Sequence, residues 1–147
     1  STTAETYASW SPDGTKITFQ NDGGGTNYEI YVINADGTNL IQITDDPVVD
    51  GLPSWSPDGA RIAFASGAIG NGDIYVMSTD GTNKTAITNL STDVRFPSWS
   101  ADGSKLAFMS DHDGNYEVYV TDVTGSNQTI SRLTNNSAQD GLGGIDW

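Results

Sequence analysis

One motif, Trp-Ser-Pro-Asp-Gly, returns along this chain at a nearly constant interval, and it constrains the fold more than any other feature. The motif is complete at 10–14 and 55–59, has Ala in place of Pro at 99–103, and is echoed by a fourth Trp at residue 147. The four tryptophans are therefore 45, 44 and 48 residues apart. Periods of about 20–50 residues are typical of chains built from stacked copies of one supersecondary unit. The 147 residues thus hold three copies of such a unit.

Each copy contains the same order of apolar segments and tight turns. In the first copy an apolar segment at 17–19 follows Asp-Gly, an acidic residue opens a second run at 29–32, and a Thr closes a third at 40–44. A second Gly turn precedes the last segment, with Asn two residues after the Gly in every copy. Asp-Gly between β-branched and aromatic residues is a strong hairpin signal, and no stretch has helical apolar spacing. With the segment that ends in Trp, each copy is predicted to form four antiparallel strands.

The recurring pattern SWSPDG…IAF…EIYV…DGTN…LT resembles the TolB-type β-propeller repeat, also called the WD40-like or PD40 repeat, over essentially the whole chain. The resemblance implies an all-β fold in which each repeat is a four-stranded blade, with the Trp strand innermost and the Thr strand outermost. The residues 1–147 then form one unit, with blade 1 at about 5–49, blade 2 at about 50–92, blade 3 at about 93–139 and an extra inner-type strand at 140–147. The motif residues of the three blades are Trp10, Asp13, Gly14, Trp55, Asp58, Gly59, Trp99, Asp102 and Gly103.

Three blades are too few to close a ring, since propellers typically have about 4–8 blades. Identical head-to-tail interfaces close into a ring when the rotation permits, and two chains would supply the six blades common in the TolB-like family. We therefore predict half of a six-bladed propeller that homodimerises. The extra strand at 140–147 is then either displaced or crosses to the first blade of the partner. The alternative is a fragment of a longer propeller array.

The charge balance excludes several classes of partner. Six Lys and Arg against 19 Asp and Glu give a net charge of −13, which argues against nucleic acid and anionic membranes. Cations and protein partners remain candidates. No apolar run approaches the roughly 20 residues of a membrane-spanning helix, and the first residues lack the pattern of a signal peptide. The absence of Cys excludes disulfides and thiolate sites.

Catalytic motifs are missing from the sequence. The single histidine, His112, lies between two aspartates on a predicted exposed hairpin tip, whereas Ser-His-Asp catalysis needs a buried His. No nucleophile elbow, zinc-protease motif or phosphate loop is present, and the stretch 111–122 departs from the EF-hand pattern. The motif aspartates are predicted to cap turns.

These observations favour a non-catalytic binding or scaffold module with a protein partner. The resemblance implies a periplasmic or secreted setting. The alternative function is a carbohydrate-binding or polysaccharide-degrading propeller.

A set of carboxylates precedes the inner strands, 5, 5, 6 and 7 residues before the four tryptophans: Glu5, Asp50, Asp93 and Asp140. If every inner strand starts at the same rim of the channel, these side chains form a ring around one mouth. Oxygen ligands suit Ca²⁺ or Mg²⁺, so the sequence predicts a divalent-cation site there. The alternative is a solvated rim in which the acids cap the strand starts.

Overall fold

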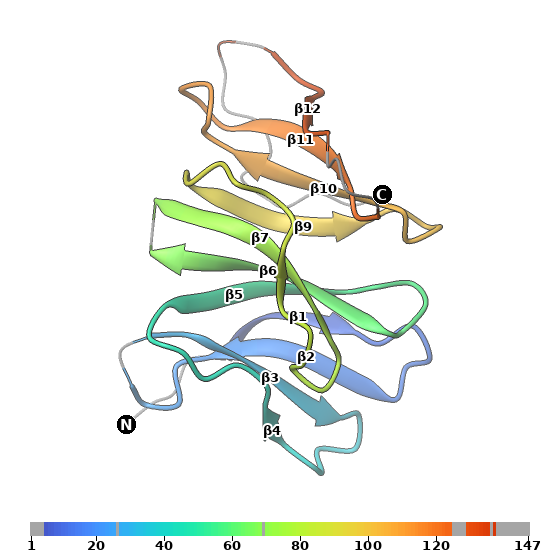
Figure 1. The fold of residues 1–147 in the computed structure, drawn as a ribbon. Helices are drawn as coiled ribbons and strands as arrows, with labels where there is room; N and C mark the ends of the chain where they lie inside the picture. The colour runs from blue at the N-terminus through green and yellow to red at the C-terminus, as the bar shows by residue number, and fades with distance from the viewer. Residues whose placement is uncertain (1–4, 26, 69, 125–128, 136, 138–147) are drawn as a thin grey trace.

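The computed structural model describes residues 5–25, 27–68, 70–124, 129–135 and 137. In these ranges the chain forms twelve β-strands and no helix, arranged as three four-stranded antiparallel sheets in chain order (Figure 1). No helix in the described ranges is long and apolar enough to cross a membrane. The prediction of three four-stranded β-blades is confirmed.

The first sheet contains β1 (Glu5–Trp10), β2 (Lys16–Asn21), β3 (Glu29–Asn34) and β4 (Ile41–Gln42). The second contains β5 (Val49–Trp55), β6 (Arg61–Ala68), β7 (Asn71–Ser78) and β8 (Thr85–Ala86). The third contains β9 (Val94–Trp99), β10 (Lys105–Ser110), β11 (Glu117–Asp122) and β12 (Ser131–Arg132). The additional strand predicted at 140–147 lies outside the described residues.

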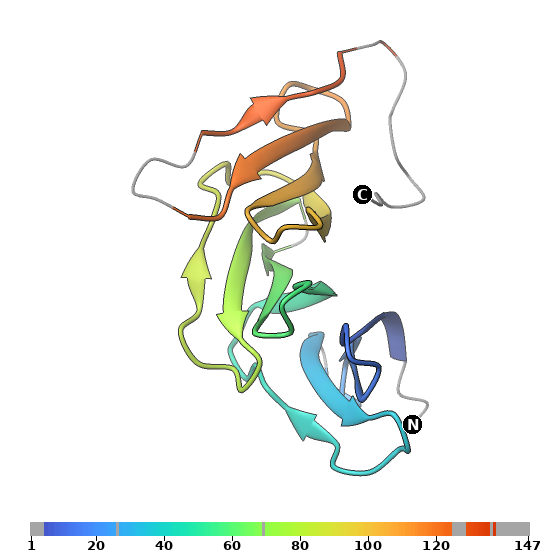
Figure 2. The ribbon, with the colours of Figure 1, turned by 90° about the vertical axis from the view of Figure 1, so that its right-hand side faces the viewer.

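The three sheets follow one another along an open arc (Figure 2), with β1, β5 and β9 on its inner side and β4, β8 and β12 at the outer edge. Strand β5 contacts both β1 and β9, so the innermost strands of the three blades are neighbours. Their shared inner side corresponds to the wall of a propeller channel.

The core lies between the sheets. One apolar cluster joins the first and second sheets and includes Ile30, Trp55 and Phe64, while a second joins the second and third sheets. Consecutive residues Ile62, Ala63 and Phe64 of β6 are all fully buried. A continuous apolar run is expected where neighbouring sheets cover both faces of a strand, and the middle blade has this arrangement.

The Trp-Ser-Pro-Asp-Gly motifs form the tight turns between the first two strands of each blade. In the first turn Asp13 Oδ1 accepts hydrogen bonds from Ser11 Oγ at 2.7 Å and from the Thr15 N–H at 3.0 Å. The same two contacts recur at Asp58 and Asp102. The following glycines, residues 14, 59 and 103, have φ of 69°, 72° and 69°, which favours Gly. These aspartates therefore cap turns, as the sequence indicated.

Each inner strand carries an irregularity that the sequence did not predict. Tyr7, Leu52 and Phe96 occupy equivalent positions, three residues before the blade's Trp, and have φ of 54°, 56° and 52°. The pairing of each inner strand with the second strand shifts register at this point. A bulky residue with positive φ is uncommon and costs conformational energy. All three residues line one cavity.

Candidate functional site

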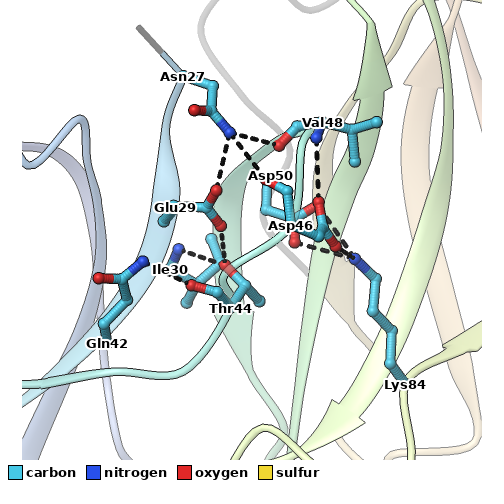
Figure 3. A network of polar contacts seen from close by, with 9 residues as sticks. All are labelled: Asn27, Glu29, Ile30, Gln42, Thr44, Asp46, Val48, Asp50 and Lys84. Atoms are coloured by element: carbon cyan, nitrogen blue, oxygen red, sulfur yellow. Dashed lines mark hydrogen bonds and ion pairs between the residues drawn. The ribbon is translucent and has the colours of Figure 1, made fainter. Parts of the chain in front are cut away.

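A threonine fastens the outer segment of each blade to the third strand. In the first blade Thr44 Oγ1 donates to Glu29 Oε2 at 2.7 Å and accepts the Ile30 N–H at 2.8 Å (Figure 3). Glu29 is buried, and burial raises the pKa of its carboxyl. Equivalent pairs of contacts join Thr88 to Asp73 and Ile74, and Thr134 to Glu117 and Val118. In every repeat, the acid and the Thr therefore together fasten the outer segment to the backbone of the third strand.

The carboxylate of Asp50 is the buried member of a partly exposed ionic network between the first two blades (Figure 3). Its side chain is completely buried, and Lys84 Nζ lies 2.9 Å from Asp50 Oδ2 and 2.7 Å from Asp46 Oδ2. The ammonium also lies 5.1 Å and 5.2 Å from the ring centres of Phe64 and Tyr75. Burial raises the pKa of the Asp50 carboxyl, and the hydrogen bonds and charge of Lys84 oppose that effect.

Asp93, the equivalent acid of the third blade, has a different cationic partner. Arg95 binds both of its oxygens, with Nη2 at 2.5 Å from Oδ2 and Nε at 3.1 Å from Oδ1. The Tyr116 hydroxyl donates to the same carboxylate. Burial disfavours the charged form, but Arg95 and Tyr116 outweigh it and hold the pKa of Asp93 below its usual range. Burial, together with the bond to Asp93, raises the pKa of Tyr116 to about 12.

Two of the four predicted cation ligands thus have counterions from this chain. Asp50 is paired with Lys84 and Asp93 with Arg95. Glu5 begins β1, where its backbone pairs with Asn21, while the Glu5 side chain and Asp140 lie outside what the structure describes. In the described part of the chain, no three His, Asp or Glu residues are grouped so that they could hold a metal ion. The divalent-cation site stays a prediction.

The hairpin tip that contains His112 lies between β10 and β11. His112 is exposed, as predicted, and neighbouring Asp113 accepts hydrogen bonds from the Tyr119 hydroxyl at 2.7 Å and from Arg132 Nη1 at 3.1 Å. These contacts fasten the tip to β11 and β12.

A cavity of about 290 Å³ lies on the inner side of the arc. The three bulge residues, Tyr7, Leu52 and Phe96, line it, together with Tyr28 and Arg95. The rings of Tyr7 and Phe96 meet edge to face at 5.8 Å between centroids, so the first and third blades touch across it. Apart from the polar side chains of Gln20, Ser66, Asp93 and Arg95, its walls are aromatic, aliphatic or glycine. Sequence analysis missed this cavity, because bulky residues give no signal for positive φ.

The two outward sheet faces of the molecule are only partly covered. Trp55 and Trp99, which pack on the preceding blade, are 8% and 6% exposed, whereas the equivalent Trp10 is 59% exposed. At the other end Leu133 is 58% exposed, while the equivalent Ile87 of the second blade is 4% exposed. The residues that bury one blade against the next thus lie in solvent at both ends of the arc.

The comparison with known sequence families agrees with this architecture. The profile described as TolB beta propeller domain matches residues 3–93, which is more than half of the chain. This chain belongs to the TolB β-propeller family. Among curated protein sequences, none matches it.

Two TolB structures resemble this TolB-family chain in both fold and sequence. TolB from Acinetobacter baumannii superposes with a TM-score of 0.78 at 28% identity, over 92% of this chain and 33% of its own. A protein described as TolB from Agrobacterium tumefaciens gives a TM-score of 0.72 at 28% identity, over 86% of this chain and 48% of its own. The chain therefore spans about half the length of these TolB proteins or less.

The TolB-type fold of this chain is shared with enzymes at lower identity. A puromycin-hydrolyzing peptidase of Mycobacterium tuberculosis gives a TM-score of 0.72 at 17% identity, covering 91% of this chain and 22% of its own. An oligogalacturonate lyase in complex with manganese gives 0.66 at 13% identity, covering 88% and 40%. At these identities the likeness shows the fold alone.

Proposed function

We propose that this chain is a non-catalytic binding module whose two open blade faces are covered by a second copy of itself, giving a six-bladed TolB-like ring. The observation that carries the proposal is the exposure of Trp10 at a position where Trp55 and Trp99 are buried. By its family, we place the module in the periplasm. Its functional partner would be another protein, which the ring binds without transforming it.

The two open faces repeat the chemistry of the two closed interfaces. Ile17 pairs with Trp10 in the sheet as Ile62 pairs with Trp55, and Phe19 stacks on Tyr31 as Phe64 packs on Tyr75. The blade 1 face is defined here as Trp10, Ile17, Phe19 and Leu40, and the blade 3 face as Val118, Val120 and Leu133. In each closed interface, the following blade contributes side chains like those of the blade 1 face. The preceding blade contributes side chains like those of the blade 3 face.

The comparison of Leu40 with Lys84, its equivalent in the second blade, supports an apolar contact at the blade 1 face. Leu40 follows the Asp-Gly-Thr-Asn turn of the first blade as Lys84 follows that of the second. Lys84 is held between blades by its two carboxylates, whereas Leu40 is exposed. Burial of apolar area is favourable by about 25 cal/mol per Å², and head-to-tail interfaces close into a ring. A second copy arranged head to tail therefore buries both apolar faces at once.

The use of the charged groups supports a non-catalytic role. Glu29 is held by Thr44, Asp50 by Lys84, and Glu117 by Thr134 and Arg132. These buried acids hold strands and blades together, and the exposed motif aspartates cap turns. Catalytic acids and bases instead need to meet a substrate in a cleft.

Light scattering coupled to size-exclusion chromatography tests the proposal. In the micromolar range the chain should have twice the 15.6 kDa mass of one chain. Trp10→Ser should shift the mass to that of one chain, because it removes the largest exposed apolar side chain of the blade 1 face. Val48→Ser, at an exposed residue of the segment between β4 and β5, is the matched control and should remain dimeric. A wild-type mass of one chain across this range would overturn the proposal.

A further inference from the structure

The cavity on the inner side of the arc is lined by three aromatic side chains. Tyr7 comes from β1, Phe96 from β9, and Tyr28 from the residue before β3. Tyr7 is half exposed, and its ring meets that of Phe96 at an interplanar angle of 60°. The two rings therefore lie together at the cavity wall.

The backbone holds these walls in place before any ligand arrives. The bulges at Tyr7, Leu52 and Phe96 share nearly the same positive φ. The middle bulge is fixed by Gln20, a buried side chain whose Oε1 accepts the Leu52 N–H at 2.8 Å. The same oxygen would lie 2.5 Å from a Cβ at Gly51, so a larger residue there would displace the Gln20 amide. Strained backbone conformations repeated around a cavity are a recognised sign of a preorganised site.

The negative net charge of the protein favours a positively charged ligand. The chain carries a net charge of −13, so its field attracts cations and repels anions. The one cationic side chain of the cavity wall, Arg95, is neutralised by both oxygens of Asp93. Arg95 also lies 5.0 Å from the ring centre of Tyr116, so a cation already rests on an aromatic face at this wall.

We propose that the cavity binds an organic cation through an alkylammonium group held against the faces of Tyr7 and Phe96. Aromatic faces attract ammonium groups within about 6 Å of the ring centre, and groups of aromatic rings are the usual protein site for quaternary ammonium. An inorganic cation needs several oxygen ligands, and among the described residues no group of three His, Asp or Glu could hold one. The free cation of a small molecule and the basic side chain of a peptide share this chemistry.

Calorimetric titration with choline chloride, at an ionic strength kept constant with NaCl, tests the ligand class. Choline should bind saturably, and its uncharged analogue 3,3-dimethylbutan-1-ol should bind about tenfold more weakly, as expected for one well-placed cation–π contact. Equal binding of the two compounds, or no saturable heat with choline, would overturn the proposal. A parallel titration with N-acetyl-lysine methyl ester distinguishes the sources: binding tighter than that of choline assigns the site to basic peptides, and weaker binding assigns it to free quaternary ammonium.

Phe96→Leu tests the aromatic wall with little disturbance of the backbone. Leu52 already adopts φ of 56° at the equivalent bulge, so Leu is compatible with this conformation. The variant should bind choline about tenfold more weakly while its melting temperature and circular dichroism stay close to those of the wild type. Ile41→Val, at an exposed position of β4 outside both the cavity and the two end faces, is the control and should bind choline normally. Wild-type choline affinity in Phe96→Leu would contradict the proposal, whatever the oligomeric state.

Discussion

Asp13 and Asp102 show how the repeat uses its exposed acids. Each accepts a side-chain hydrogen bond from the Ser two residues earlier and a backbone N–H from two residues later. The Ser11 hydroxyl contributes most to lowering the pKa of Asp13, and the Ser104 N–H contributes most for Asp102. A carboxylate that accepts several hydrogen bonds in the folded state is more acidic there than in the unfolded chain.

We predict that carbon-detected NMR titration will give Asp13 and Asp102 pKa values of about 2. Because the folded-state pKa lies below the unfolded value, the ionised caps stabilise the fold above that unfolded value. This contribution is lost as the pH falls through the folded-state pKa, between about pH 4 and pH 2. Asp102→Asn should show a shallower loss of stability over that window. Titration of both groups at the ordinary Asp value would contradict the turn-capping role.

The sequence did not reveal what surrounds the inner-strand acids. Spacing alone placed Asp50 and Asp93 at the strand starts. In the structure Asp50 is the second residue of β5, and Asp93 immediately precedes β9. The partner of Asp50, however, is 34 residues away, and the repeat has Leu40 at the position of Lys84. A contact made by one copy of a repeat leaves no periodic signal. The bulges are hidden for another reason: Tyr, Leu and Phe are residues that rarely adopt positive φ.

At the scale of the elements, β4 pairs with β3 through only two residue positions, Tyr31 with Gln42 and Val32 with Ile41. The contacts of Thr44 with Glu29 and the Ile30 N–H extend this short attachment. Turn and strand chemistry could be predicted from the sequence because local signals specify them. The Thr and the acid were visible as recurring residues, but their contact depends on the register of two strands.

Thr44→Val should lower the free energy of unfolding by about 1–3 kcal/mol, because it leaves the buried Ile30 N–H and the Glu29 carboxyl without this partner. Urea denaturation at neutral pH measures the change. Thr85→Val, at an exposed position of β8, is the matched control and should alter stability by less than about 0.5 kcal/mol. An equal effect of the two substitutions would refute the proposed fastening role.

Lys84→Met should destabilise the protein by about 3–5 kcal/mol at neutral pH, since it leaves Asp50 buried without its counterion. The double variant Lys84→Met with Asp50→Asn should recover much of this loss. Burial raises the pKa of Asp50, so acidification should protonate it and narrow the difference between the single and double variants. Urea denaturation of both variants across pH 4–7 measures this, and a difference that does not depend on pH would count against the buried ion pair.

At the scale of the whole molecule, the three blades form an arc whose end faces have the residues of closed interfaces. The period of the Trp motif was sufficient to predict the number of blades and their order, because each blade buries its neighbour with the same positions. The same period explains why Trp10 and Leu133 are exposed while Trp55 and Ile87 are buried. A head-to-tail pair of chains would place each open face against the other.

The mass of an equimolar mixture of Trp10→Glu and Leu133→Lys chains, measured by light scattering, tests this arrangement most directly. Each variant alone should have the mass of one chain, because every head-to-tail interface then includes one altered face. In the mixture one interface unites two unaltered faces, so the account predicts twice the 15.6 kDa mass of one chain. A mixture that keeps the mass of one chain, or a single variant that remains dimeric, would contradict the head-to-tail ring.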